Sequence, residues 1–126
     1  MVEKFRILIL EDSATDASLM EFELEEAGIP FVSKRVQQEK DFVQALQECS
    51  PDLVLSDYDL PQYNGLLALG EVKSRSAGTP FILVTGACDT NLAKRIVIKG
   101  ANDVVMKDEL YKLTPAVRQA LKISTP

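Results

Sequence analysis

Carboxylate, hydroxyl and ammonium side chains stand directly after short apolar runs of this sequence. They are Glu11, Asp12, Asp57, Thr85 and Lys107. If the apolar runs form parallel strands, these side chains emerge together at one edge of one sheet, which is where open α/β sheets bind ligands. Carboxylates crowded at such an edge repel one another, and a bound divalent cation relieves that repulsion. Because the chain contains no histidine, its oxygen ligands favour Mg²⁺ over zinc.

Asp57 is the candidate nucleophile of this set. The Thr85 hydroxyl and the Lys107 ammonium are donors that suit the equatorial oxygens of an incoming phosphoryl group, alongside the metal ion. Asp57 would then attack the phosphorus in line and form an acyl phosphate. Histidine, the commonest general base near neutral pH, is absent, so carboxylates, hydroxyls and amines must carry any chemistry.

The apolar pattern alternates between short continuous runs and longer segments with helical spacing. The continuous runs are typical of strands buried on both faces, and they cover residues 5–10, 31–36, 53–56, 81–84 and 104–106. Helical spacing is found between them, for example at Met20, Leu24 and Ala27. A strand followed by a helix therefore occurs five times. This order predicts the α/β class, with a doubly wound parallel five-stranded sheet and helices on both faces.

Residues with turn or capping preferences mark the ends and beginnings of the helical segments. The ends of the first four segments are marked by Gly28, Ser50, Gly78 and Gly100. Asp89 is a candidate N-cap of the fourth helix. Thr114 and Pro115 predict an N-cap followed by proline at the first position of the fifth helix.

In residue type, order and spacing, the sequence resembles the receiver domain of two-component response regulators. The family's motif has an acidic pair, a phospho-accepting aspartate with proline and glycine four and eight residues later, a switch hydroxyl and a lysine. The corresponding residues here are Glu11 and Asp12, Asp57, Pro61 and Gly65, Thr85 in the run Val-Thr-Gly-Ala, and Lys107. The resemblance covers essentially the whole chain.

This resemblance implies a flavodoxin-like (βα)5 fold with strand order 2-1-3-4-5 and a Mg²⁺ site. By analogy with the family, the carboxylates of Asp12 and Asp57 would ligate the metal together with the backbone carbonyl of Asp59. Glu11 would contribute through a water molecule or from the outer shell. Thr85 and Lys107 would complete the catalytic set around the phospho-acceptor.

The resemblance also implies a signalling module rather than an enzyme with external substrates. A sensor histidine kinase or a phosphotransfer domain would dock on the first helix and donate a phosphoryl group to Asp57. The chain would catalyse only its own phosphorylation and dephosphorylation, and phosphorylation would switch its interaction surface. Residues 1–126 are expected to form a single receiver domain with no output domain. A candidate homodimer or partner face contains Leu92, Lys94, Arg95, Ile96 and Lys99, although its apolar members are more often part of the core.

Three positions bear on how a phosphorylated state would be stored and transmitted. Asp108 stands where the family usually has a proline, often with a cis bond, so the loop after Lys107 is expected to differ. Val104 stands where the family usually has an aromatic residue that swings inward with the switch hydroxyl, so signal output would use another route. Asp59 adds a carboxylate near the acceptor that would repel an attacking hydroxide, and we therefore expect a fairly long-lived phosphoryl group.

Length and charge narrow the class of protein. The chain has 126 residues, one domain by the usual size of domains, and a net charge of −5, which makes it a poor direct binder of nucleic acid. No stretch approaches the roughly 20 apolar residues of a membrane span, and the first residues do not resemble a signal peptide. A cytoplasmic protein without membrane insertion is therefore expected. Cys49 and Cys88 lack metal-ligand spacing and are expected to be ordinary thiols.

Other functions match parts of the pattern. Asp57 and Asp59 fit the Asp-x-Asp of haloacid-dehalogenase-type phosphatases, but those enzymes need a longer chain and would not require Glu11 and Asp12. A receiver-like scaffold that binds partners without phosphorylation is disfavoured by the intact acceptor, hydroxyl and lysine. A flavodoxin-like FMN site would need a hydroxyl- and glycine-rich loop after the first strand, and the sequence has none there.

Overall fold

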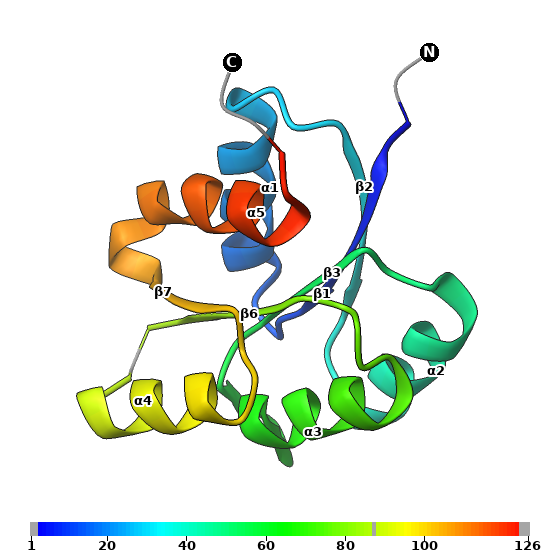
Figure 1. Ribbon diagram of the computed structural model, residues 1–126, viewed down its shortest axis with the longest axis vertical. Helices are drawn as coiled ribbons and strands as arrows, with labels where there is room; N and C mark the ends of the chain where they lie inside the picture. The colour runs from blue at the N-terminus through cyan, green and yellow to red at the C-terminus, as the bar shows by residue number, and fades with distance from the viewer. Residues whose placement is uncertain (1–2, 87, 124–126) are drawn as a thin grey trace.

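A five-stranded parallel sheet forms the centre of the computed structural model, which describes residues 3–86 and 88–123 (Figure 1). Its strands are β1 (Phe5–Leu10), β2 (Phe31–Val36), β3 (Leu53–Ser56), β6 (Phe81–Thr85) and β7 (Asp103–Met106). They lie in the order β2-β1-β3-β6-β7, and every neighbouring pair is parallel. Since β6 and β7 are the fourth and fifth strands of this sheet along the chain, the predicted order 2-1-3-4-5 and the α/β class are confirmed.

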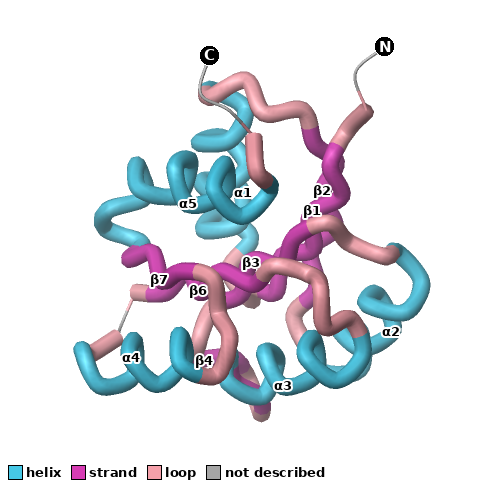
Figure 2. The backbone as a smooth tube through the Cα atoms, viewed as in Figure 1, coloured by secondary structure: helices cyan, strands magenta, loops and turns pink. Residues whose placement is uncertain are grey.

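Helices cover both faces of the sheet (Figure 1, Figure 2). One face carries α1 (Ala14–Glu26) and α5 (Leu113–Leu121), and the other carries α2 (Glu39–Cys49), α3 (Gly65–Arg75) and α4 (Thr90–Ile98). The buried apolar residues form one cluster on each face, because strand side chains alternate between the two sides. The doubly wound arrangement is therefore confirmed.

The strands differ in burial according to their place in the sheet. Every residue of β3 and of β6 is buried, as expected for central parallel strands covered on both faces. The edge strand β2 is exposed over residues 32–35, which matches the weaker apolar character of that run. The carboxyl ends of β1, β3 and β6 are therefore formed by buried strand residues.

Side-chain caps and left-handed residues set the helix boundaries. Ser13 caps α1. As predicted, Asp89 caps α4, where it accepts a hydrogen bond from the Leu92 N–H at 2.7 Å. Gly28, with φ of +75°, turns the chain after α1, and Ser50 ends α2 in the left-handed region. In the described part of the chain, no helix has the length and apolar character to cross a bilayer.

The start of α5 differs from its prediction. A 3₁₀ helix, η1 (Lys107–Lys112), runs directly into α5, which begins at Leu113 with Lys112 at the capping position and no side-chain cap. The predicted cap at Thr114 is therefore wrong, because the chain already turns helically before that residue. Pro115 still lies in the first turn, where its missing N–H leaves no helical hydrogen bond unmade.

A short hairpin that the apolar pattern did not indicate joins β3 to α3. It consists of β4 (Asp59–Leu60) and β5 (Tyr63–Asn64), paired antiparallel around a turn at Pro61 and Gln62. Gln62 has φ of +59°, which is the left-handed sign that the residue after proline takes in a type II turn. Leu60 and Tyr63 are buried in the cluster under α2 and α3, so the hairpin is anchored to the core.

Candidate functional site

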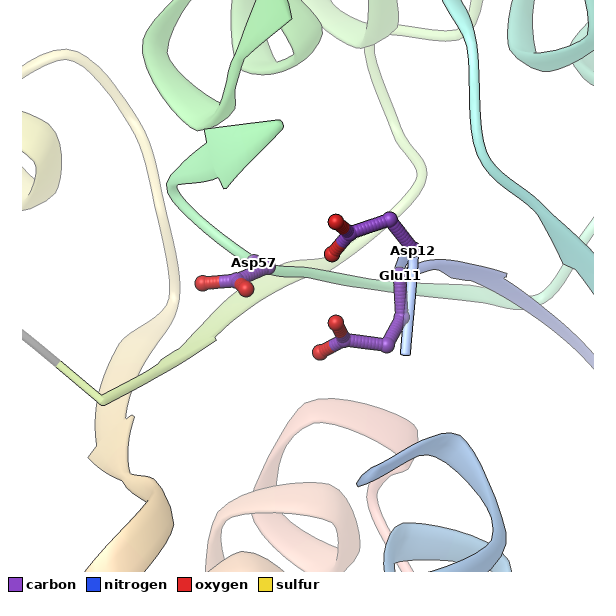
Figure 3. A group of neighbouring side chains, drawn as sticks. All are labelled: Glu11, Asp12 and Asp57. Atoms are coloured by element: carbon purple, nitrogen blue, oxygen red, sulfur yellow. The ribbon is translucent and has the colours of Figure 1, made fainter. Parts of the chain in front are cut away.

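Glu11, Asp12 and Asp57 meet at the carboxyl edge of the sheet. The first two follow β1 and Asp57 follows β3, which are hydrogen-bonded neighbours. One carboxylate oxygen of each residue lies within 4.8 Å of the others, and Figure 3 shows the carboxylates of Glu11 and Asp12 facing Asp57 from two sides. Glu11 and Asp57 are buried and Asp12 is exposed. Solvent therefore reaches the group from the Asp12 side.

Backbone hydrogen bonds hold Asp57 in register with β1. Its N–H donates to the Leu10 carbonyl at 2.9 Å, which extends the β1–β3 ladder by one residue. Its Oδ1 accepts a hydrogen bond from the Tyr58 N–H at 2.7 Å, and the Ser56 hydroxyl donates to its carbonyl at 2.8 Å. Oδ1 is thus fixed by the backbone, and Oδ2 is left for other partners.

Gly65 allows the chain after Asp57 to fold back closely. Its N–H donates to the Tyr58 carbonyl at 2.8 Å. A Cβ at this position would lie 2.9 Å from the Asp57 carbonyl oxygen and 2.6 Å from Leu83 Cδ1, which is closer than packed atoms approach. The eight-residue spacing from Asp57 to Gly65 therefore has a steric basis.

Glu11 is a fully buried carboxylate. Its Oε2 accepts a hydrogen bond from the Ser13 N–H at 3.1 Å. Its Oε1 lies 2.7 Å from Lys107 Nζ, but not in the direction of a regular hydrogen bond. Burial raises the pKa of Glu11, and this effect outweighs the lowering by Lys107 and by the Ser13 N–H.

Lys107 lies among three carboxylates. Its Nζ is 2.7 Å from Glu11 Oε1, 2.9 Å from Asp16 Oδ2 and 3.0 Å from Asp57 Oδ2. Burial works to lower the pKa of Lys107, but the contacts with these carboxylates raise it above the ordinary lysine value. A positive charge is therefore held at the Asp57 oxygen that the backbone leaves free.

Thr85 and Asp59 belong to the segments that follow or end strands at the same edge. Thr85 is the last residue of β6 and is buried. Because Ser56 pairs with Leu83 in the register of β3 and β6, Thr85 lies just beyond the level of Asp57. Asp59 begins β4, two residues after Asp57, with its side chain exposed. The structure thus brings every predicted site residue to one edge of the sheet.

The two residues that depart from the family pattern lie on either side of Lys107. Val104 is half-buried in β7, and Asp108 is exposed in η1. All peptide bonds among the described residues are trans. The chain after Lys107 enters η1 directly, with Glu109 outside helical φ and ψ.

Asp16 is a site residue that sequence reasoning missed. It follows no strand, and an acidic residue in the first turn of a helix is common because it complements the helix dipole. Only the structure shows that its carboxylate contacts Lys107.

The residues present fit a magnesium ion. All candidate ligand atoms are oxygens, three carboxylates are close enough to share one ion, and the buried Glu11 Oε1 makes no regular hydrogen bond. Hard oxygen donors of this kind suit Mg²⁺, which needs few protein ligands because it keeps several waters. Asp12, Asp57 and Glu11 are the carboxylates that would hold it.

The apolar residues of the proposed α4 face divide between the core and the surface. Ile96 is fully buried, so it belongs to the core. The exposed apolar residues are Val97, at 47 %, and Ile98, at 82 %. Leu92 is half-buried. Helix rotation against the sheet decides which apolar side chains face inward, and the spacing alone left that rotation open.

Comparison with known proteins identifies one domain type. The family model of the response regulator receiver domain matches residues 7–118. The chain is 28 % identical over 127 residues to the transcriptional regulatory protein FixJ of Bradyrhizobium diazoefficiens, which covers 100 % of the chain and 61 % of FixJ. It is 28 % identical over 102 residues to the chemotaxis protein CheY of Bacillus subtilis, covering 81 % of the chain and 84 % of CheY.

Some relatives are much longer than this chain. The regulatory protein AtoC of Escherichia coli is 36 % identical over 76 residues, which are 60 % of the chain but 16 % of AtoC. The chain thus spans less than two thirds of FixJ and of AtoC. The matched region corresponds to one part of each of these proteins.

Solved structures show the same fold. The signal receiver domain of a protein described as a LuxO repressor from Vibrio parahaemolyticus superimposes with a TM-score of 0.85 at 26 % identity, covering 95 % of this chain and 92 % of that one. A CheY-like response regulator receiver domain protein from Methanospirillum hungatei gives a TM-score of 0.83 at 21 % identity, covering 95 % of each chain. At the latter identity the likeness concerns the fold alone.

Proposed function

Because the chain belongs to the response regulator receiver family of two-component signalling, we propose that it accepts a phosphoryl group on Asp57 in a Mg²⁺-dependent reaction and thereby switches its interaction surface. One observation carries this proposal. Lys107 Nζ lies 3.0 Å from Asp57 Oδ2, and the carboxylates of Glu11 and Asp12 lie within 4.8 Å of Asp57. A nucleophile, a fixed cation and a set of metal ligands therefore share one site.

The chain's own groups would divide the work of phosphoryl transfer. Asp57 forms an oxygen–phosphorus bond as the bond from phosphorus to the donor's nitrogen or oxygen breaks, and the leaving group departs with that electron pair. The Tyr58 N–H orients the Asp57 carboxylate through Oδ1. Lys107 faces the negative charge of the phosphoryl oxygens, and the Thr85 hydroxyl donates to one of them. Mg²⁺, when bound, would supply further neutralisation of charge on the same oxygens.

The phosphoryl donor would be a separate molecule. The chain contains no histidine, so a phosphohistidine must come from a partner, a histidine kinase or a phosphotransfer protein, as is usual for receiver domains. Leu19 and Phe22 on α1 are 50 % and 56 % exposed, which supports docking of such a partner on this helix. Beyond its own phosphorylation and dephosphorylation, we propose no catalysis by this chain.

We also propose that the chain forms one receiver domain. The described residues form one sheet between two helical layers, which supports a single receiver domain over residues 1–126; residues 1–2, 87 and 124–126 lie outside the described part. Nothing in the described part resembles a separate output domain. FixJ and AtoC are longer than the region that they share with this chain.

Incubation with acetyl phosphate and Mg²⁺, followed by intact-mass measurement, tests the function. We expect one added phosphoryl group on the wild-type chain and none on Asp57→Asn. Chelation of the metal should abolish the addition. If neither acetyl phosphate nor a histidine kinase phosphorylates the wild type, the chain is a binding scaffold and the proposal is wrong.

The carboxylate of Asp59 would prolong the phosphorylated state. It is exposed and close in sequence to the acceptor, so it would repel an approaching hydroxide. We expect Asp59→Asn to lose its phosphoryl group faster than the wild type, measured as decay of the phosphorylated mass after the donor is removed. An unchanged half-life would remove this role from Asp59.

A further inference from the structure

Asp16 contacts the site from α1, outside the group of potential metal ligands. Its Oδ2 accepts a hydrogen bond from Lys107 Nζ at 2.9 Å. We propose that Asp16 is a positioning residue that anchors the Lys107 ammonium at the phosphoryl site when a metal ion engages the other carboxylates. This inference rests on the proposed phospho-acceptor function and adds a residue to its machinery.

The local structure of α1 leaves the Asp16 carboxylate free for this contact. Asp16 is the third residue of α1, where an acidic side chain often folds back to accept the N–H of the capping residue. Here the Ser13 N–H donates to Glu11 Oε2 instead, at 3.1 Å. The Ser13 hydroxyl accepts the Asp16 N–H at 3.2 Å and fixes the backbone. The Asp16 carboxylate can therefore contact Lys107 while the Ser13 hydroxyl still caps α1.

The three carboxylates around Lys107 are not equivalent. Glu11 and Asp57 belong to the group of three acidic residues that can share a cation, together with Asp12, and Asp16 does not belong to it. A divalent cation on Glu11 and Asp57 would weaken their hold on Lys107, because it competes for the same oxygens and repels the ammonium. Asp16 would keep its contact, since the cation does not engage it.

The contact with Asp16 would keep the Lys107 ammonium at the site when a metal ion is bound. Lys107 is 21 % exposed and Asp16 is 37 % exposed at the side chain, so an unanchored ammonium could swing into solvent. The anchor keeps the positive charge near Asp57 Oδ2, where the incoming phosphoryl group arrives. Because α1 carries Asp16, the position of this helix also sets the position of Lys107.

Rates of phosphorylation by acetyl phosphate at saturating Mg²⁺ test the proposal. We expect Asp16→Ala to be slower than the wild type by about three- to fivefold, the scale of one partly exposed charged contact. Asp16→Asn retains an acceptor without the charge, and its rate should lie between the two. Glu26→Gln is the matched control, because it removes one negative charge from an exposed position of the same helix, and its rate should equal that of the wild type.

A double-mutant cycle separates positioning from general damage. In a Lys107→Met background, Asp16→Ala should cause no further loss of rate, since the anchored group is absent. Calorimetric titration should give the same Mg²⁺ affinity for Asp16→Ala and the wild type, within about twofold, because Asp16 is not a ligand. Urea unfolding of each variant would show that the fold is retained.

Nuclear magnetic resonance of ¹⁵N-labelled lysine provides a readout that does not require phosphorylation. An anchored ammonium exchanges slowly with solvent, so we expect a Lys107 signal in the Mg²⁺-loaded wild type, assigned by its loss in Lys107→Met. That signal should disappear in Asp16→Ala. An unchanged signal, an equal or faster phosphorylation rate, or an undiminished loss in the Lys107→Met background would each overturn the role of Asp16. Absence of phosphorylation in the wild type would instead overturn the proposed function.

Discussion

The carboxyl edge around Asp57 and the side formed by α4 and β7 differ in the kind of contact that their side chains make. At the edge, Lys107 contacts three carboxylates within 3.0 Å, and Asp57 uses both of its oxygens. On the other side, Val97 and Ile98 are exposed and line a hollow of about 460 Å³ together with the half-buried Val104. Both regions border β6 or β7, yet only the first is built from contacts between charged side chains.

This difference separates the chemistry of the domain from its readout. The residues that would accept and hold a phosphoryl group contact one another, so each constrains the others. On the α4–β7 side, Val97 and Ile98 expose apolar surface next to the charged residues Lys94 and Asp103, and Val104 replaces the aromatic residue usual in the family. We therefore expect the phosphorylation proposed for Asp57 to be separable from the surface that would report it. The following experiments test whether the two regions are independent.

Loss of Lys107 should have the largest effect. In Lys107→Met, the buried Glu11 carboxylate loses its cation, and we expect the free energy of unfolding to fall by about 2–3 kcal/mol at neutral pH without metal. Urea denaturation would measure this. Lys112→Met is the control, because Lys112 pairs with Glu109 at the surface and its loss should not be measurable. Equal free energies of unfolding for the wild type and Lys107→Met would show that the Lys107 ammonium does not stabilise the buried Glu11 carboxylate.

The second-largest effect is expected for Gly65→Ala, which adds a methyl group at position 65. Gly65→Ala places a Cβ against the Asp57 carbonyl and Leu83, and we expect a loss of about 1–2 kcal/mol in the free energy of unfolding, with slower phosphorylation of Asp57. Gly70→Ala is the control within the same helix, since nothing lies within 4 Å of its added Cβ. That variant should be more stable than the wild type by about 0.5–1 kcal/mol. Similar behaviour of the two variants would contradict the steric role of Gly65.

The pH dependence of stability should reveal the burial of Glu11. Because its pKa is raised in the folded state, its protonated form favours folding, and this contribution is lost as pH rises from the ordinary glutamate range through the raised value. Relative to Glu11→Gln, the wild type should therefore lose stability over that interval. Chemical denaturation of both proteins at several pH values in a chelator would measure the difference. A constant difference across the interval would contradict this assignment.

The smallest effect is expected at Ile98. Its side chain is 82 % exposed, so Ile98→Ser should change the free energy of unfolding by no more than about 0.5 kcal/mol. The rate of phosphorylation by acetyl phosphate should stay the same if the two regions are independent. A clear change in that rate, measured by intact mass, would show that α4 is coupled to Asp57.

Most of the fold was predictable because its signals are local. Continuous apolar runs gave β1, β2 and β3 with their observed bounds, and β6 and β7 within one residue. The polar residues that follow these strands identified the carboxyl edge, because parallel strands must end there together. Strict alternation of strands and helices left few topologies to consider.

The remaining features depend on contacts between distant segments. Asp16 looks like an ordinary first-turn acid until Lys107 is brought to it, and the burial of Ile96 rather than Val97 depends on how α4 packs. The β4–β5 hairpin is too short for a periodic signal and depends on the anchoring of Leu60 and Tyr63. The start of α5 was missed because η1 turns the chain before Thr114.

The contact between Lys107 and Asp16 joins residues that are 91 positions apart, and the contact between Lys107 and Asp57 spans 50. Bringing such distant residues together costs loop-closure entropy, and Lys107 follows β7, the last strand of the sheet along the chain. A partly folded chain, or one released before its last strand is made, would display Asp57 without its cation. If Asp57 accepts a phosphoryl group as proposed, its reactivity toward a phosphoryl donor would therefore serve as an assay of complete folding.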